Sequence, residues 1–409
     1  MKVLVISAAF PPMPAGEADH AFHLCEHLSA NGLDIHVLTT KENVARGNFP
    51  FKVYPLIRYW TWPDVLNLAR FIRRCSPDAI LLLYSGWIYN NHPMITFVPV
   101  LAKILVPHTP FITQFEIDYF SFQASFLTQT VLKVIRRCMG LEKIDSVLGT
   151  LLSVSDHIIV LSERHQAQFA KRFPGMHGKS MVVPPPPLLQ MSPANDEALR
   201  WCSREVLGVR PGDFLITHFG YLYPGKGAET LFKALQIMNN RRHNVRLLMV
   251  GGGKKGALDR SYTQELEALA KRLEIDDKII WTGEYAWDSD EASRYLRLAD
   301  ACVLPFTEGV SLNRSSFAAA VAHGLPTVTT KGKVLESPFI DRKNVLLCSP
   351  NDPDSLADTL DLLIASPELR QRLRAGALEL TREWFCWDKV VERTVEALKM
   401  AKKKIYTLH

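Results

Sequence analysis

Residues 214–227 read FLITHFGYLYPGKG, a short apolar run followed by a loop that holds three glycines and one lysine. An apolar run of this length indicates a buried strand, and the glycines indicate a tight loop. Residues 228–238 continue with the apolar spacing of an amphipathic helix. A strand that passes through a glycine loop into a helix is the first unit of a doubly wound α/β domain.

The start of the chain repeats this order. Residues 3–7 form an apolar run, residues 11–16 (PPMPAG) a loop, and residues 18–31 a helical pattern that Gly32 stops. Because 409 residues exceed one ordinary α/β core, we expect two domains. The pattern predicts further buried strands at residues 35–39, 79–83, 111–114, 157–161, 247–250, 279–282, 301–304 and 327–329, with helices over 264–273, 291–298 and 315–323.

Four consecutive prolines at residues 184–187 mark the domain boundary, since they can enter neither a helix interior nor a central strand. We therefore expect Rossmann-like domains over residues 1–190 and 191–384, facing each other across a cleft. After Pro367 the pattern is helical with a break near Trp384. We expect the final helix, within residues 385–409, to pack back on the first domain.

The composition limits the classes of partner. Lys and Arg number 48 against 42 Asp and Glu, a mild excess that fits an anionic small substrate or weak attraction to an anionic membrane better than nucleic acid. The seven cysteines are scattered singly, which indicates a reducing compartment and no zinc site. The longest apolar stretch, residues 97–112, is interrupted by charge and proline and is too short to span a bilayer. We expect a cytoplasmic protein with possible peripheral contact at the inner membrane.

Two loops carry the chemistry. Loops at the carboxyl ends of parallel strands lead into helix N-termini, which favour anions. In residues 220–227, Lys226 can pair with phosphate, although a surface turn with a solvated lysine explains the same residues. In residues 306–316 (FTEGVSLNRSS), Glu308 can accept bonds from sugar hydroxyls while the N–H groups near Ser311 and Leu312 point at a pyrophosphate. Ser315 or Ser316 could equally cap a helix, and we favour the ligand role.

Other candidate features have simpler explanations. Asp288-Ser289-Asp290 has the spelling of an Asp-x-Asp metal motif, but it precedes a helix, so we expect Ser289 or Asp290 to be its N-cap. The basic segment 131–137 (VLKVIRR) fits either anionic lipid or, as we favour, a packed helix with a solvated face. We expect packing or hydrogen-bonding roles for the lone histidines, of which the last could also lie near a nucleotide: His92, His165, His218 and His323.

Several segments, taken in order, resemble the retaining GT-B glycosyltransferases of family 4 over essentially the whole chain. They are the strand at Val3 with Pro11-Pro12 and Gly16, Gly220 to Gly227, Val250-Gly251-Gly252-Gly253, Trp281-Thr282-Gly283-Glu284, residues 299–305 (ADACVLP), Glu308-Gly309, and residues 322–330 (AHGLPTVTT). Each segment is weak evidence alone. The resemblance implies a GT-B fold.

The resemblance also implies residue roles. Gly16 would offer its N–H to the distal phosphate, and Lys226 would neutralise the pyrophosphate. Glu308, with Gly309 and Val310, would hold the donor sugar. The remaining implied ligands of the nucleotide and phosphates are Tyr221, Gly225, Gly283, Glu284, Tyr285, Ser311, Leu312, Arg314 and Ser316.

Three positions depart from the family pattern. Tyr221 stands where the family commonly has Arg, Ser316 where it has a second Glu, and Glu116 where it has a first-domain His. Arg314 and the Ser316 hydroxyl are the candidate replacements. Glu116 and Asp118 join Glu308 as candidate catalytic carboxylates.

The resemblance implies retaining transfer of a sugar, such as glucose or a related hexose, from a nucleotide-diphosphate sugar that we expect to be uridine-linked, such as UDP-glucose. The acceptor would be a saccharide or a lipid-linked molecule in polysaccharide synthesis, of the exopolysaccharide or heterocyst-envelope type. We expect no metal and no cofactor. The alternatives are a nucleotide-sugar epimerase of the same fold and a non-catalytic nucleotide-sugar binding protein.

Overall fold

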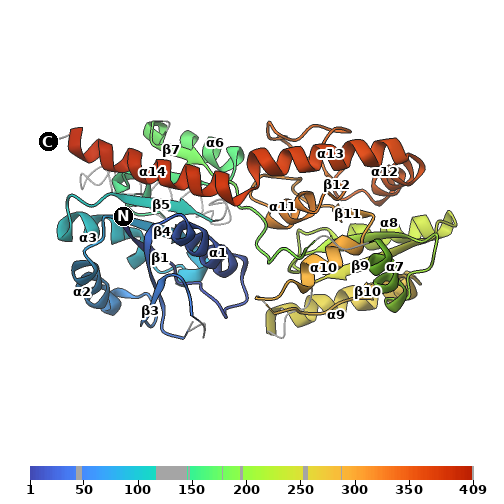
Figure 1. Cartoon of the computed structure of the whole chain (residues 1–409), viewed down its shortest axis with the longest axis horizontal. Helices are drawn as coiled ribbons and strands as arrows, with labels where there is room; N and C mark the ends of the chain where they lie inside the picture. Colours follow the sequence, from blue (N-terminus) through green and yellow to red (C-terminus); the bar gives the residue numbers. More distant parts are fainter. Residues whose placement is uncertain are drawn as a thin grey trace, which may run out of the picture. The chain divides into compact units, whose positions relative to one another are not determined.

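The computed structural model describes two compact units, which we treat separately (Figure 1). Unit 1 comprises Met1–Pro184 and Trp387–His409, and unit 2 comprises Pro185–Cys386. The chain leaves unit 1 inside the proline run and returns to it at Trp387. The residues described are 1–42, 48–116, 145, 148–176, 178–193, 197–251, 257–286 and 288–407.

Unit 1 contains a seven-stranded parallel sheet with the order β3-β2-β1-β4-β5-β6-β7. Its order reverses between β1 and β4, where Val3 pairs with Ala79. The strands are β1 Lys2–Ile6, β2 Asp34–Thr40, β3 Lys52–Ile57, β4 Ala79–Tyr84, β5 Phe111–Phe115, β6 His157–Val160 and β7 Ser180–Val182. The helices are α1 Gly16–Ala30, α2 Val65–Cys75, α3 Val98–Leu105, α5 Leu151–Val154, α6 Glu163–Arg172 and α14 Trp387–Thr407, with 3₁₀ turns η1 Trp62–Asp64, η2 Gly86–Tyr89, η3 Pro93–Phe97 and η5 Pro174–Met176.

Unit 2 repeats the architecture with a six-stranded parallel sheet in the order β10-β9-β8-β11-β12-β13. Its order reverses between β8 and β11. The strands are β8 Phe214–Phe219, β9 Val245–Val250, β10 Ile279–Trp281, β11 Ala301–Leu304, β12 Thr327–Thr330 and β13 Leu346–Cys348. The helices are α7 Glu197–Val206, α8 Ala228–Asn240, α9 Ala257–Arg272, α10 Glu291–Leu298, α11 Ser315–Ala322, α12 Pro353–Ala365 and α13 Pro367–Trp384, with the 3₁₀ turn η6 Asp276–Lys278.

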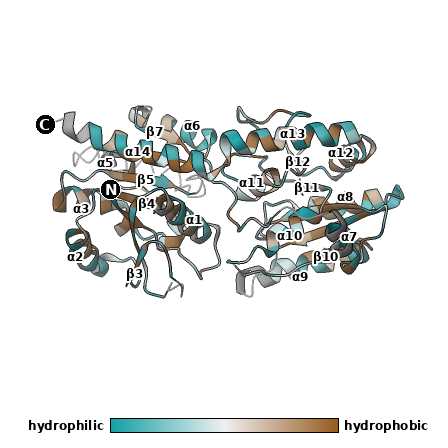
Figure 2. Ribbon diagram, in the orientation of Figure 1, coloured by the Kyte–Doolittle hydropathy of each residue, from teal (hydrophilic) through white to brown (hydrophobic). Residues whose placement is uncertain are grey.

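The prediction of an α/β fold with two parallel sheets is confirmed. Residues 3–6 of β1 and all of β11 are buried because helices cover both faces of a parallel sheet, and hydrophobic residues dominate such strands (Figure 2). The strands that the pattern did not predict are β3, β7 and β13, all at or next to a sheet edge. Edge strands lack a continuous apolar signal, and β3 contains Pro55.

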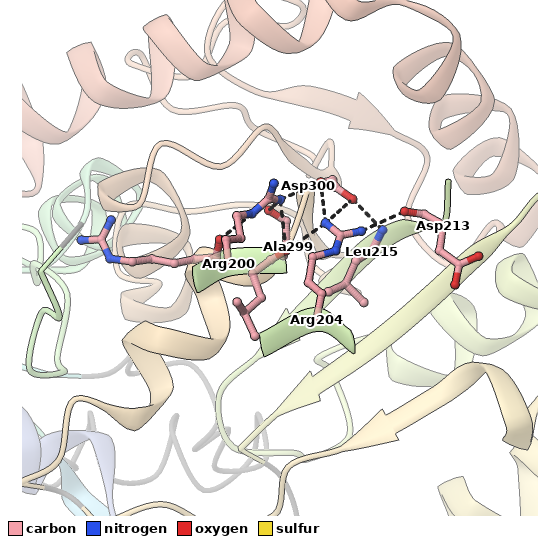
Figure 3. Close-up of polar contacts among 8 residues, drawn as sticks. Arg200, Arg204, Asp213, Leu215, Ala299 and Asp300 are labelled. Carbon is pink, nitrogen blue, oxygen red and sulfur yellow. Dashed lines mark hydrogen bonds and ion pairs between the residues drawn. The ribbon is translucent and has the colours of Figure 1, made fainter. Parts of the chain in front are cut away.

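An ion-pair cluster joins α7 to the start of β11 (Figure 3). Arg204, whose side chain is buried, donates from Nη1 to both carboxylate oxygens of Asp300 at 2.9 and 3.1 Å. Arg200 donates from Nη2 to Asp300 Oδ1 at 2.8 Å, and the N–H of Leu215 donates to Oδ2 at 2.8 Å. Asp300 therefore holds α7, β8 and β11 together, and its role in the ADACVLP segment is structural.

The terminal helix α14 packs against α1, β5 and β6 of unit 1. At its start the ring of Trp387 stacks on His27 with 4.3 Å between ring centroids. None of the helices in the described part of the chain is long and apolar enough to cross a lipid bilayer.

Candidate active site

The two loops that carry the predicted chemistry lie at neighbouring strands in unit 2. Residues 220–227 follow β8, and residues 305–314 follow β11. These strands pair directly, and the strand order reverses between them. Ligands of open α/β sheets bind at such a reversal, beyond the carboxyl ends of the strands.

Glycine geometry fixes the first loop against the second. Gly227 has φ +77°, and a Cβ on it would lie 1.9 Å from the carbonyl oxygen of Pro305. Gly225 has φ +104° and accepts a hydrogen bond at 3.1 Å from the N–H of Thr307. A side chain at residue 227 would therefore push the loops apart and displace Lys226 between these glycines.

Lys226 is a buried cation. Its Nζ donates to Ser316 Oγ at 2.9 Å and lies 5.5 Å and 5.3 Å from the ring centroids of Tyr223 and Phe306. Within the described ranges no carboxylate forms an ion pair with it. Burial, reinforced by the nearby positive charge of Arg314, lowers the pKa of Lys226 to about 7. An anionic ligand would supply the missing negative charge.

Arg314 lies near Lys226, and both side chains contact the ring of Phe306. Its guanidinium lies 4.8 Å from the ring centroid of Phe306, and its Nη1 donates to the Tyr223 hydroxyl at 3.2 Å. Arg314 is also the N-cap residue of α11, without a side-chain cap bond. Ser315 and Ser316 are thus not the N-cap, and the Ser316 hydroxyl accepts a bond from Lys226 instead.

The second loop is tied to the strand and loop that follow it. Gly309 has φ +89°, and a Cβ there would lie 2.2 Å from Gly332. The N–H of Val310 donates to the Thr330 carbonyl at 3.0 Å, and the N–H of Leu312 donates to Glu336 Oε2 at 2.5 Å. In this structure the Leu312 N–H that we expected to bind phosphate therefore faces a carboxylate.

Two features of this loop were missed by the sequence analysis. Glu336 is buried and follows β12 much as Glu308 follows β11, a parallel that could have drawn attention to it. The hydroxyl of Ser311 is buried and has no hydrogen-bond partner, although we considered only its backbone. The N–H of Arg314 donates to the Ser311 carbonyl at 3.2 Å, so this unpartnered hydroxyl lies one turn before Arg314 and is a candidate ligand-binding group.

The segment expected to border the base lies next to the same strands. Gly283 forms an isolated bridge with Gly251, the residue after β9. The ring of Tyr285 stacks on Phe219, the last residue of β8, with 6.4 Å between centroids. Glu284 and Glu308 are exposed, and the Tyr221 side chain is half-buried.

In unit 1, Glu116 directly follows β5 and is buried. Its Oε2 lies 2.6 Å from His20 Nδ1, and its Oε1 accepts a bond at 2.8 Å from Gln114 Nε2. His20, on α1, was missed by the sequence analysis because a histidine on an apolar helix face is usually a packing residue. Gly16 opens α1. Asp118 and the segment 131–137 lie outside the described residues.

A second carboxylate lies near this pair. Glu17 Oε1 accepts bonds from Trp87 Nε1 at 2.6 Å and from Ser85 Oγ at 3.2 Å. Burial raises the pKa of Glu17, with a smaller contribution from the charge of Glu116. Unit 1 thus gathers two carboxylates and an imidazole at the carboxyl ends of β4 and β5, a set that can bind hydroxyl groups.

The Asp288-Ser289-Asp290 motif is accounted for by local contacts. Asp290 is the N-cap residue of α10 but makes no side-chain cap bond, and it pairs instead with Arg294 at 2.8 Å. Ser289 Oγ donates to the Ala286 carbonyl at 3.0 Å. The part of the chain that the structure describes contains no group of three His, Cys, Asp or Glu side chains placed to hold a metal ion.

His323 and His218 are buried in unit 2. The ring of His323 makes bonds through both nitrogens, Nδ1 to the Ala319 carbonyl at 2.7 Å and Nε2 to Ser293 Oγ at 2.7 Å. His218 Nδ1 donates to the Val303 carbonyl at 2.9 Å. Burial lowers the pKa of each to about 4. Both therefore have hydrogen-bonding roles in the core.

Comparisons with known proteins show which families and structures this chain is similar to. The family model described as "Glycosyl transferases group 1" matches residues 200–379, which lie within unit 2. An uncharacterized glycosyltransferase of Methanocaldococcus jannaschii is 27% identical over 427 residues, covering 98% of each chain. Unit 2 therefore matches the group 1 glycosyltransferases.

Other glycosyltransferases match over shorter stretches of the chain. A D-inositol 3-phosphate glycosyltransferase of Xylanimonas cellulosilytica is 29% identical over 253 residues, covering 60% of this chain and 57% of the relative. The chain thus matches only about half the length of several curated relatives of that name.

Solved structures of low identity share the fold. Sucrose-phosphate synthase from Thermosynechococcus elongatus matches with a TM-score of 0.73 at 17% identity, covering 100% of both chains. Anabaena HepE in complex with UDP and glucose matches with a TM-score of 0.72 at 16% identity, covering 98% and 99%. The chain therefore shares the GT-B fold of these structures.

Proposed function

We propose that the protein transfers a sugar from a nucleotide-diphosphate sugar to an acceptor hydroxyl, with retention at the anomeric carbon. The observation that carries the proposal is Lys226, a buried cation that lacks a carboxylate partner among the described residues. Arg314 lies beside it, and the Ser311 hydroxyl nearby in the chain is unsatisfied. Two cations and a buried donor fit the pyrophosphate of such a donor molecule.

The donor is a uridine-diphosphate hexose such as UDP-glucose in this proposal. Support comes from the group 1 relatives and from HepE, which has been solved with UDP-glucose and has the same fold. Tyr285 and the Gly283-Glu284 backbone border the base. Glu308, with Gly309 and Val310, holds the sugar hydroxyls.

The reaction proceeds by front-face attack in this proposal. The anomeric carbon–oxygen bond to the diphosphate breaks while the acceptor oxygen forms the new bond on the same face, and a leaving phosphate oxygen takes the acceptor proton. Lys226 and Arg314 stabilise the negative charge that develops on the diphosphate. With two cations at this point, the proposal requires no metal ion.

Unit 1 supplies the acceptor side in this proposal. The buried Glu116 and His20 pair, with Glu17, offers carboxylate oxygens and a ring nitrogen to hydroxyl groups of a saccharide or of a lipid-linked saccharide. His20 Nδ1 is bonded to Glu116, which leaves Nε2 for such a contact.

One experiment separates this function from the two alternatives. The protein is incubated with UDP-glucose without acceptor, and uridine diphosphate, glucose and sugar epimers are measured. Slow release of uridine diphosphate and glucose supports a transferase, an epimeric nucleotide sugar indicates an epimerase, and binding without turnover indicates a binding protein. Lys226→Ala should abolish the release, whereas Lys233→Ala, which removes an exposed lysine on α8, should leave it unchanged.

A further inference from the structure

An exposed aromatic and basic surface lies on unit 1 at the β3 edge of the sheet. It comprises three large apolar side chains, Tyr59, Trp62 and Leu66, which are 54%, 52% and 64% exposed. It also includes the exposed arginines Arg58, Arg70, Arg73 and Arg74. We call this set the α2 surface, after the helix that carries most of it (Figure 1).

The loop that enters α2 is held in a fixed shape. Trp60 is buried, and its Nε1 donates to Thr40 Oγ1 at 2.8 Å. The buried carboxylate of Asp64 accepts the N–H groups of Tyr59 and Thr61, each at 3.2 Å. The inward Trp60 and the bonded Asp64 hold this turn rigid. The ring of Trp62 contacts His92 and Phe97, each with 5.9 Å between centroids, yet Trp62 and Tyr59 remain about half exposed. A group of exposed aromatic side chains of this kind marks an interaction surface.

The spacing along α2 separates an inner face from an outer one. Leu68, Ile72 and Cys75 are buried. Leu66, Arg70 and Arg73-Arg74 recur at intervals of three and four residues, so they share the opposite face with Trp62 in the preceding turn. Figure 2 shows both hydrophobic and hydrophilic residues along this helix.

The charge of the surface is uncompensated. The segment 65–75 contains three arginines and no acidic residue. None of the four arginines of the α2 surface forms an ion pair with another described residue. The acidic residues that flank the helix are bonded elsewhere, Asp64 to the turn and Asp78 to the N–H of Lys2 at 2.8 Å.

We propose that the α2 surface binds an anionic lipid bilayer and holds the protein at the membrane surface. Arginines pair with lipid phosphates, and tryptophan and tyrosine side chains favour the boundary between headgroups and acyl chains. A helix with an exposed leucine among arginines lies in that boundary rather than across the bilayer. The proposal concerns unit 1 surface residues and is independent of the proposed sugar transfer.

Vesicle sedimentation tests the proposal on the full chain. Vesicles of phosphatidylcholine with 30% phosphatidylglycerol should bind the protein, whereas pure phosphatidylcholine vesicles should bind it far less. Replacing Arg70, Arg73 and Arg74 by Gln should weaken binding to the anionic vesicles by roughly 100-fold, and 0.5 M salt should weaken it in wild type. Trp62→Ala with Leu66→Ser should also weaken binding, but with little effect on its salt dependence.

The matched control removes the same charge from another helix. Arg372→Gln, Arg374→Gln and Arg382→Gln together alter three exposed arginines of α13 in unit 2 and should leave vesicle binding within about twofold of wild type. Quenching of tryptophan fluorescence by brominated lipid should fall in Trp62→Phe. Equal loss in the α13 variant, unchanged binding in the α2 variants or unchanged quenching in Trp62→Phe would overturn the proposal. All variants should keep the wild-type circular dichroism spectrum and thermal midpoint.

Discussion

At the scale of one residue, the lowered pKa of Lys226 should make the binding of uridine diphosphate take up a proton to an extent that depends on pH. Burial lowers its pKa to about 7, and a pyrophosphate beside Nζ would favour the charged form and raise that pKa again. We expect Lys226 to take up about one proton when uridine diphosphate binds at pH 8, and almost none when it binds at pH 6. Titration calorimetry in buffers of different ionisation enthalpy measures this uptake. Equal uptake at both pH values, or uptake that persists in Lys226→Met, would contradict the assignment.

Glu308 and Glu116 are distinguished by conservative replacement. Glu308→Gln keeps the shape of the side chain but removes its charge, so it should lower donor hydrolysis and transfer by roughly ten- to a hundredfold, the equivalent of a charged hydrogen bond to the sugar. Affinity for free uridine diphosphate should stay nearly intact, since that ligand lacks the sugar. Glu116→Gln, on the acceptor side, should lower transfer to the acceptor by a similar factor but change donor hydrolysis little. Calorimetry with free diphosphate decides: a large loss of affinity in either variant removes that residue from the sugar contacts.

At the scale of elements, Gly227 is the point where two loops touch. Its positive φ and the 1.9 Å approach of a Cβ to Pro305 leave no room for a side chain. Gly227→Ala should displace the Lys226 loop and weaken uridine diphosphate binding at least tenfold, measured by calorimetry. Gly175→Ala is the control, because a Cβ there meets open space at an ordinary φ. Wild-type affinity in Gly227→Ala would show that the loop does not depend on this contact.

Asp300 joins α7, β8 and β11, and we expect its negative charge to be needed for this stabilisation. Asp300→Asn keeps an acceptor for Leu215 but leaves the buried Arg204 without a counter-ion. We expect the free energy of unfolding to fall by about 2–4 kcal/mol in urea titration. Asp290→Asn, which breaks an ion pair with the exposed Arg294, should cost under about 1 kcal/mol. Similar losses in both variants would argue against a stabilising role for the Asp300 ion pairs.

The strand and loop order was predictable from sequence because it rests on local patterns. The strand Phe214–Phe219 and the helix Glu291–Leu298 begin and end where their apolar spacing predicts. Contacts between distant segments were not predictable in this way. The bond from Leu312 to Glu336 and the pairing of His20 with Glu116 join residues that lie 24 and 96 positions apart in the chain, so they depend on the whole fold. The spacing of residues within one segment does not predict such long-range contacts.

For the whole molecule, two buried histidines of unit 2 make the free energy of unfolding depend on pH in mild acid. The pKa of His218 and of His323 is about 4 when folded and about 6.5 when unfolded, so between these values the unfolded chain binds more protons. The free energy of unfolding should therefore fall as pH drops from 6.5 towards 4, by about 2 kcal/mol per histidine at pH 5. Lys226, with a folded pKa of about 7, is mostly protonated in both states below pH 6.5 and adds only a small opposite change. Urea titrations at pH 7 and pH 5 measure the change, and His323→Gln should reduce it.

The return of the chain to unit 1 at Trp387 has a consequence for synthesis on the ribosome. Unit 2 is one continuous stretch, whereas unit 1 is interrupted by the 202 residues from Pro185 to Cys386. At a synthesis rate of about 5–20 residues per second, making these residues takes on the order of 10–40 s. Only after that interval is α14, which packs on α1, β5 and β6, synthesised. The nascent chain therefore finishes its second unit before its first. During that interval the surface under α14 is open to chaperones.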